Sequence, residues 1–110
     1  MNHIIFNDDN IKQFSKLLKD KKVIILYKMN NCAHCNELKP KWDIVIKKLS
    51  NENINIYEIE YSFVSKLPSK YREILGYPTI LSYDNGKSIN EFKGKRTMRN
   101  IETFIKENTK

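Results

Sequence analysis

The chain has 110 residues, of which 40% are hydrophobic and 30% charged; this is typical of one soluble globular domain, and we expect a single domain over residues 1–110. Two cysteines, three glycines and three prolines exclude a disulfide-rich secreted scaffold and collagen, and argue against a Pro/Gly-rich disordered chain. The net charge of +7 comes mainly from scattered lysines. Because bidentate phosphate recognition favours arginine, we do not expect nucleic-acid binding.

The chain carries no sign of membrane insertion or export. No apolar run approaches the roughly 20 residues of a membrane span, and the first residues do not resemble a secretory signal peptide. The last residues contain no retention or lipidation motif. These features predict a cytoplasmic protein, or one in the viral particle or host cytoplasm if the source is a large DNA virus.

Apolar residues at alternating or helical spacing divide the chain into strands and helices. In chain order we expect a strand at 4–6, a helix at 9–19, a strand at 23–27, a helix at 32–49, a strand at 54–59, an irregular helical stretch at 66–74, strands at 79–83 and 88–92, and a final helix capped by Thr97. Asn7, Asp8 and Asp9 supply N-cap chemistry for the first helix. Pro40 lies inside the second helix and should kink it.

The predicted order βαβαβαββα indicates an α/β domain built on a mixed central sheet. Strands separated by helices favour parallel pairing in the N-terminal part of the chain. Asn85-Gly86 predicts a tight hairpin turn, which adds an antiparallel pair at the C-terminal side.

Cys32 and Cys35 form a Cys-x-x-Cys motif where a buried strand gives way to a helix. At this spacing their Cα atoms should lie close enough for a disulfide. The helix N-terminus favours thiolate, so we expect Cys32 to be the exposed, activated sulfur and Cys35 to be the more buried, resolving one. A cationic His34 beside Cys32 would stabilise the thiolate further, which makes the disulfide more oxidising.

Three other interpretations of this motif remain open at the sequence level. A structural zinc site needs about four ligands, but the chain has only two Cys and two His, with His3 remote in sequence; we therefore expect no metal and no other cofactor. An inert disulfide closing so short a loop would remove little chain entropy. His34 could be an incidental surface histidine.

These residues resemble the thioredoxin superfamily, and within it the protein disulfide isomerase type of domain. The likeness covers nearly the whole chain at ordinary spacings. The matching residues are Tyr27, Cys32-Ala33-His34-Cys35, Leu38, Pro40, Trp42, Gly76-Tyr77-Pro78-Thr79-Ile80, Asn85-Gly86-Lys87, Phe92, Gly94, Arg96-Thr97 and Ile101.

The resemblance implies a thioredoxin fold with helices on both faces of the sheet and a substrate-binding surface around the cysteines. It implies that Pro78 is cis and faces the cysteines, and that the backbone of Tyr77 pairs with substrate peptide. Asn31 and Ala33, which flank Cys32, are expected to contact substrate as well. Arg96 is implied as a residue that swings toward the site and tunes Cys35.

Three positions depart from the family pattern. Leu26 stands where family members usually hold a buried acid that relays a proton for the second cysteine, and Leu81 stands where isomerase-type domains often pair that acid with a lysine. Losing both together is physically coherent, because a lone buried charge is costly. It leaves Cys35 without an obvious base, so we expect slower resolution of mixed disulfides, with the proton passing to water, to His34 or to the incoming thiol. Asn31 replaces the usual tryptophan before the first cysteine, which indicates a different choice of partner.

The sequence thus predicts a monomeric thiol–disulfide oxidoreductase that acts on protein disulfides and dithiols, is more oxidising than a typical thioredoxin, and is recycled by an unidentified reductase or sulfhydryl oxidase. The alternatives are a thioredoxin-fold binding module with secondary redox activity, a cytosolic thioredoxin-type reductase, and a glutathione-dependent glutaredoxin.

Overall fold

A computed structural model describes all 110 residues. The strands are β1 (Asn2–Ile5), β2 (Lys22–Lys28), β3 (Asn55–Glu60), β4 (Thr79–Asp84) and β5 (Lys87–Glu91). The helices are α1 (Phe14–Leu18), α2 (Ala33–Lys48), α3 (Tyr61–Val64) and α4 (Met98–Asn108), with short 3₁₀ turns at Ile11–Gln13 and Ser69–Tyr71.

The five strands form one mixed sheet in the order β1-β3-β2-β4-β5. β3 runs parallel to both β1 and β2, whereas β4 is antiparallel to β2 and to β5. The predicted parallel N-terminal part and antiparallel C-terminal hairpin are therefore confirmed. The hairpin turns at Asn85 and Gly86, both with positive φ (51° and 78°), as a tight two-residue turn requires.

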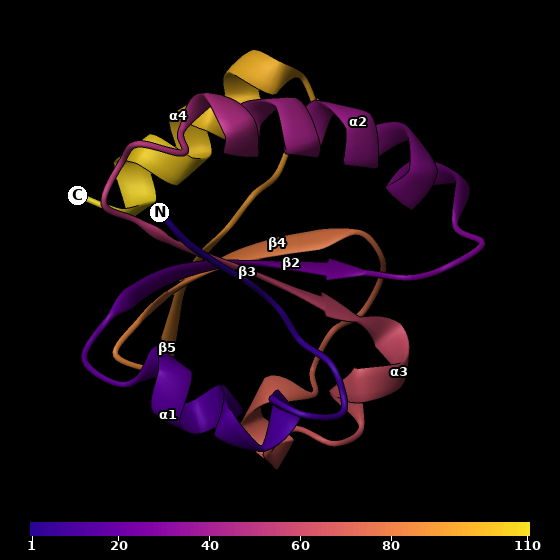
Figure 1. The fold of residues 1–110 in the computed structure, drawn as a ribbon. Coiled ribbons are helices and arrows are strands. Elements are labelled where there is room, and N and C mark those ends of the chain that lie inside the picture. The colour runs from indigo at the N-terminus through magenta and orange to yellow at the C-terminus, as the bar shows by residue number, and fades with distance from the viewer.

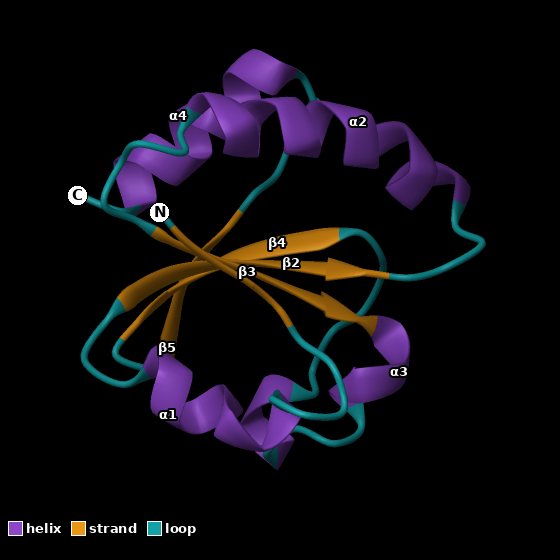
Figure 2. Ribbon diagram, in the orientation of Figure 1, coloured by secondary structure: helices purple, strands orange, loops and turns teal.

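Helices cover both faces of the sheet, as Figures 1 and 2 show: α2 and α4 lie on one side, and α1 and α3 on the other. The central strand β2 is buried on both faces, which explains its continuous apolar run. Residues alternate along it between two cores. Ile24 and Leu26 pack beneath α2 and α4, and Val23, Ile25 and Tyr27 pack on the α1 side.

Two of the predicted helices differ from the structure. The stretch at 9–19 is a 3₁₀ turn followed by the short α1, because the Asn7 side chain accepts hydrogen bonds from the amides of Asp9 and Asn10 and holds a turn there. The stretch at 66–74 contains only the second 3₁₀ turn, since Pro68 disfavours helical backbone in the residue before it. The regular helix instead begins at Tyr61, directly after β3, where the Glu60 side chain caps it.

Helix α2 agrees with the prediction to within one residue at each end, with Cys32 and Leu49 as its caps and Pro40 inside it. It curves over the sheet and projects its first turn beyond the end of β2 (Figure 1). No helix in the structure combines the length and the apolar character that crossing a bilayer requires.

Candidate active site

The two cysteines lie at the first turn of α2, just beyond the end of the central strand. The link from β2 passes through Asn31, whose φ is +59°, and turns the chain into the helix. Cys32 is the N-cap residue: its sulfur accepts a hydrogen bond from the backbone N–H of Cys35 at 3.2 Å. This sulfur therefore takes the place that a serine or aspartate oxygen usually has at a helix start. The two sulfurs are not joined in a disulfide in this structure.

The surroundings of Cys32 favour its thiolate. Its pKa is lowered, first by the Cys35 thiol, which donates a hydrogen bond to the Cys32 sulfur, and then by the backbone N–H groups of Cys35 and His34. The positive charge of Arg96 acts in the same direction. These surroundings favour Cys32 over Cys35 as an attacking sulfur, because the thiolate is the attacking form of a cysteine.

Cys35 has the opposite tendency. Burial, together with the hydrogen bond that it donates to Cys32, raises its pKa to about 11. The sequence-based expectation that Cys32 is exposed is wrong, since it is only 9% exposed; Cys35 is the more buried residue, as expected, but only slightly, at 7%. The pKa values of the two cysteines differ because burial raises that of Cys35 and because Cys35 donates the hydrogen bond that Cys32 accepts.

The loop before β4 brings a backbone carbonyl close to Cys32. The Tyr77–Pro78 peptide bond is cis, and the Tyr77 carbonyl oxygen lies 3.7 Å from the Cys32 sulfur. The ring of Tyr77 packs edge-on against Tyr61, with centroids 5.4 Å apart. The residue whose carbonyl contacts the sulfur thus also carries a ring that packs on the first residue of α3.

The remaining residues expected at the site lie around the same turn. Asn31, Ala33 and His34 are exposed beside the cysteines. The imidazole of His34 has no hydrogen-bond partner, so the influence of this residue on Cys32 comes through its backbone N–H. Arg96 is exposed in the segment before α4 and acts on both cysteines through its charge. No group of three or more His, Cys, Asp or Glu side chains forms a possible metal site.

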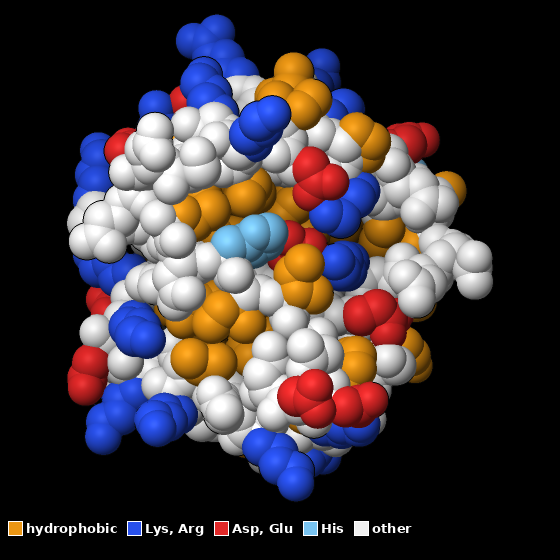
Figure 3. Space-filling view, in the orientation of Figure 1, with side chains coloured by type: hydrophobic (Ala, Val, Ile, Leu, Met, Phe, Trp, Pro, Cys, Tyr) orange, Lys and Arg blue, Asp and Glu red, His pale blue; other side chains and the backbone are white.

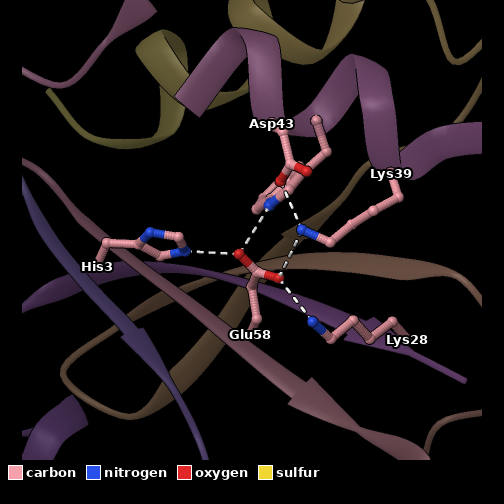
Figure 4. A network of polar contacts seen from close by, with 6 residues as sticks. His3, Lys28, Lys39, Asp43 and Glu58 are labelled. Carbon is pink, nitrogen blue, oxygen red and sulfur yellow. Dashed lines mark hydrogen bonds and ion pairs between the residues drawn. The ribbon is translucent and has the colours of Figure 1, made fainter. Parts of the chain in front are cut away.

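A buried carboxylate that the sequence analysis missed lies beneath α2. Glu58 on β3 is fully buried, and Figure 4 shows it at the centre of a polar network. One oxygen, Oε2, lies 2.5 Å from His3 Nε2 and accepts from the Trp42 indole N–H at 3.2 Å. The other, Oε1, accepts from Lys28 Nζ at 2.9 Å and lies 3.6 Å from Lys39 Nζ.

Glu58 is ionised in this network. Burial alone would raise its pKa, but the hydrogen bonds from Lys28 and His3 and the charges of Lys28 and Lys39 lower the pKa to about 2. Its strand position is directly opposite Leu26 in the β2–β3 register. Since residues paired across two strands point to the same face, the buried acid absent at position 26 is found one strand away.

One signal in the sequence could have revealed Glu58. It interrupts the run Ile56-Tyr57-Glu58-Ile59 in a strand predicted to be covered by helices. A charged residue in such a strand must find partners in the fold. Its partners lie 16 to 55 residues away in the chain, so their identity could not be read from local patterns.

The chain is similar to known proteins across almost its full length. A family model described as Thioredoxin matches residues 4–107. The chain belongs to the thioredoxin family. This agrees with the fold, the Cys-x-x-Cys pair at the start of α2 and the resemblance drawn from the sequence.

Relatives of this thioredoxin-family chain include proteins named as disulfide isomerases. It is 31% identical over 77 residues to a putative protein disulfide-isomerase of Schizosaccharomyces pombe, covering 70% of this chain and 15% of that protein. It is 27% identical over 99 residues to protein disulfide-isomerase 5-1 of Arabidopsis thaliana, covering 87% of this chain and 67% of that protein. The chain thus spans less than a fifth of the length of the first of these relatives.

A solved structure of a disulfide isomerase domain has the same fold. The first thioredoxin domain of mouse protein disulfide-isomerase A4 superimposes with a TM-score of 0.73 at 26% identity, covering 94% of this chain and 72% of the other. The chain is thus a thioredoxin domain of the disulfide isomerase type, and its family and cysteine pair place it among the thiol–disulfide oxidoreductases in general.

Proposed function

We propose that this thioredoxin domain exchanges disulfides with protein substrates and that its cysteine pair is more oxidising than that of a typical thioredoxin. The observation that carries the proposal is the stabilisation of the Cys32 thiolate by the Cys35 thiol, the helix-start amides and Arg96. A stabilised thiolate favours the reduced protein, and a favoured reduced form makes the disulfide a stronger oxidant.

The exchange proceeds in two steps that conserve electrons. In the reducing direction, the Cys32 thiolate attacks one sulfur of a substrate disulfide; the substrate bond breaks, one substrate thiolate leaves and takes a proton from solvent, and a mixed disulfide remains. The Cys35 thiolate then attacks the Cys32 sulfur, which releases the second substrate thiolate and leaves a Cys32–Cys35 disulfide. Two electrons pass from the domain to the substrate, and the oxidising direction is the reverse.

Substrate peptide is proposed to lie across Tyr77 and Pro78. The Tyr77 carbonyl beside the Cys32 sulfur offers an acceptor to an extended peptide in the manner of an added strand. The exposed Asn31 and Ala33 would contact the residues that flank the substrate cysteine. The recycling partner is a reductase or a sulfhydryl oxidase, according to the direction in which the pair works.

The redox potential tests the oxidising character. The protein is equilibrated in graded glutathione buffers, acid-quenched and alkylated, and its free thiols are counted by mass spectrometry. We expect a midpoint nearer the roughly −180 mV of disulfide isomerase than the roughly −270 mV of thioredoxin. A midpoint at the thioredoxin value would make the domain a reductase of the thioredoxin kind.

Turnover of insulin disulfides tests the assignment of the two cysteines. Cys32→Ser should abolish turnover, whereas Cys35→Ser should accumulate covalent mixed disulfides with substrate. Turnover that survives in Cys32→Ser would refute the mechanism and favour a binding module in which the cysteines are secondary.

A further inference from the structure

Cys35 opens onto a small cavity under the first turns of α2. The cavity has a volume of about 140 Å³, and its lining includes Leu26, Pro78 and the two basic residues Lys28 and Lys39. We call it the Cys35 cavity. No carboxylate lines it. It has room for water, since one water molecule needs only about 10–15 Å³ of such volume.

The two lysines reach this cavity from different elements. Lys39 lies four residues after Cys35 in α2, so both side chains lie on the same face of the helix, one turn apart. Lys28 is the last residue of β2. Both ammonium groups converge on one atom of Glu58, the Oε1 oxygen, at 2.9 Å for Lys28 and 3.6 Å for Lys39, as Figure 4 shows. Lys39 is held further by Asp43 at 2.5 Å.

Glu102 also pairs with two lysines, Lys48 and Lys106, but its side chain is partly exposed and each lysine contacts a different oxygen. On the face shown in Figure 3, many basic side chains lie near the edge, and others lie near the centre close to the pale-blue histidine and to acidic atoms. The Lys66–Asp8 pair, for example, joins two exposed side chains, and such pairs contribute little to stability. Glu58, by contrast, has no exposed surface, and the two lysines that it pairs with line the same cavity as Cys35.

The attack of Cys35 on the mixed disulfide would be helped by positive charge near its sulfur. Cys35 must become a thiolate to attack the mixed disulfide, and burial opposes that ionisation. Glu58 is a poor base for this purpose, because its pKa is about 2 and its oxygens already hold three hydrogen bonds and the ion pair with Lys39. A fixed positive charge in a poorly solvated site stabilises a nearby anion far more than one in bulk water.

We propose that Glu58 is a positioning residue for the resolving half-reaction, which holds Lys28 and Lys39 at the wall of the Cys35 cavity so that their charge stabilises the Cys35 thiolate. The proposal rests on the thiol–disulfide exchange proposed above. The proton of Cys35 leaves to water in the cavity, the thiolate attacks the Cys32 sulfur, and the departing substrate thiolate is protonated by solvent. The network thereby performs electrostatically what an acid–base relay would perform by proton transfer.

Two other charged or titratable groups face Cys35. They are Cys32, the partner sulfur in the same turn, and Arg96, from the segment before α4. Variants of the lysines leave both in place, so a change in the resolving step is attributable to the network.

A double-mixing stopped-flow experiment isolates this step. The reduced protein is first reacted with dipyridyl disulfide at acid pH, where the Cys32 thiolate attacks and Cys35 stays protonated. A jump to a series of neutral and alkaline pH values then starts the attack of Cys35, and the release of the second thiopyridone is followed by absorbance. The first release reports Cys32, and the second reports Cys35.

Lys28→Met and Lys39→Met should each slow the second release at neutral pH by about three- to tenfold and move its pH midpoint upward by up to about one pH unit, since one unit corresponds to a tenfold change in thiolate. The first release should be unchanged. Lys39→Arg, which keeps the positive charge, should release the second thiopyridone at the wild-type rate. Lys41→Met is the matched control, because Lys41 is exposed on the same helix and makes no ion pair.

The role of Glu58 is tested by a double-mutant cycle. Glu58→Gln should slow the second release in the wild-type background and have no further effect in Lys28→Met/Lys39→Met, because it acts through the lysines. A merely structural role would lower thermal stability without moving the pH midpoint. A second release with wild-type rate and midpoint in both lysine variants would overturn the proposal. A wild-type protein without a first release would instead contradict the proposed function.

Discussion

The ionised state of Glu58 makes a quantitative prediction for the stability of the fold. Its pKa of about 2 in the folded protein compares with an ordinary value of 4.5, and each pKa unit corresponds to about 1.4 kcal/mol. The carboxylate therefore contributes about 3 kcal/mol of pH-dependent stability. Because the folded-state pKa is the lower one, this contribution is complete above about pH 4.5 and is lost as the pH falls toward about 2.

The measurement is urea unfolding of the wild type and of Glu58→Gln across this pH range. Trp42, the only tryptophan, donates a hydrogen bond to Glu58 and provides the fluorescence signal, with circular dichroism as a second probe. Between about pH 4.5 and pH 2, the free energy of unfolding of the wild type should fall by about 3 kcal/mol more than that of Glu58→Gln. The comparison cancels the titration of the other acids. Equal losses in the two proteins would show that Glu58 is not held ionised by Lys28 and His3.

Three further predictions follow from other contacts. Arg96→Met should move the midpoint of Cys32 alkylation against pH upward and make the pair less oxidising, because it removes a charge that lowers the pKa of Cys32; an unchanged alkylation profile would contradict this. Tyr27→Phe should cost about 1–2 kcal/mol in urea unfolding, because it leaves the buried Tyr83 hydroxyl without the partner now 2.6 Å away, whereas Tyr61→Phe at an exposed site should be neutral. Gly86→Ala should lower the free energy of unfolding by about 1–3 kcal/mol, since a Cβ there would lie 2.9 Å from the Tyr71 hydroxyl at a φ of +78°. Gly76→Ala is the control, because its added Cβ meets nothing within 4 Å. Equal stabilities of the two variants would refute the strain at Gly86.

The parts of the fold that the sequence predicted are those with strong local signals. The apolar run Val23–Tyr27 identified the central strand, and the spacing of Leu38, Trp42 and Val45 identified α2 almost to its ends. The first helix was predicted too long, because the Asn7 turn competes with helix formation over the same residues. The apolar spacing in this stretch does mark the buried face, since Ile11, Phe14 and Leu18 are buried. A 3₁₀ turn followed by a short helix buries the same residues, so the spacing did not fix the helix length.

The candidate site was predictable in its motif and not in its surroundings. The Cys-x-x-Cys motif at a strand-to-helix junction identified the cysteine pair, because the two residues are close in the sequence and their arrangement depends only on the local helix start. The low exposure of Cys32 was missed, because the Tyr77 carbonyl that lies 3.7 Å from its sulfur comes from a loop 45 residues away in the chain. The network of Glu58 was missed for the same reason, because His3, Lys28 and Lys39 come from three different elements and meet only in the folded sheet.

The cap formed by Cys32 has a consequence for the helix that carries it. The sulfur that accepts the Cys35 amide is also the atom that enters every covalent bond of the exchange. A thiolate is a strong hydrogen-bond acceptor, and a sulfur in a disulfide is a weak one, so forming either the mixed or the internal disulfide takes the cap away from α2. The first turn of the helix then frays more readily, and hydrogen–deuterium exchange at the Cys35 amide should be faster in the oxidised protein than in the reduced one. The order of the first turn of α2 thus depends on the oxidation state of the cysteine pair. A partner protein that binds this turn would distinguish the oxidised from the reduced domain by how well ordered the turn is.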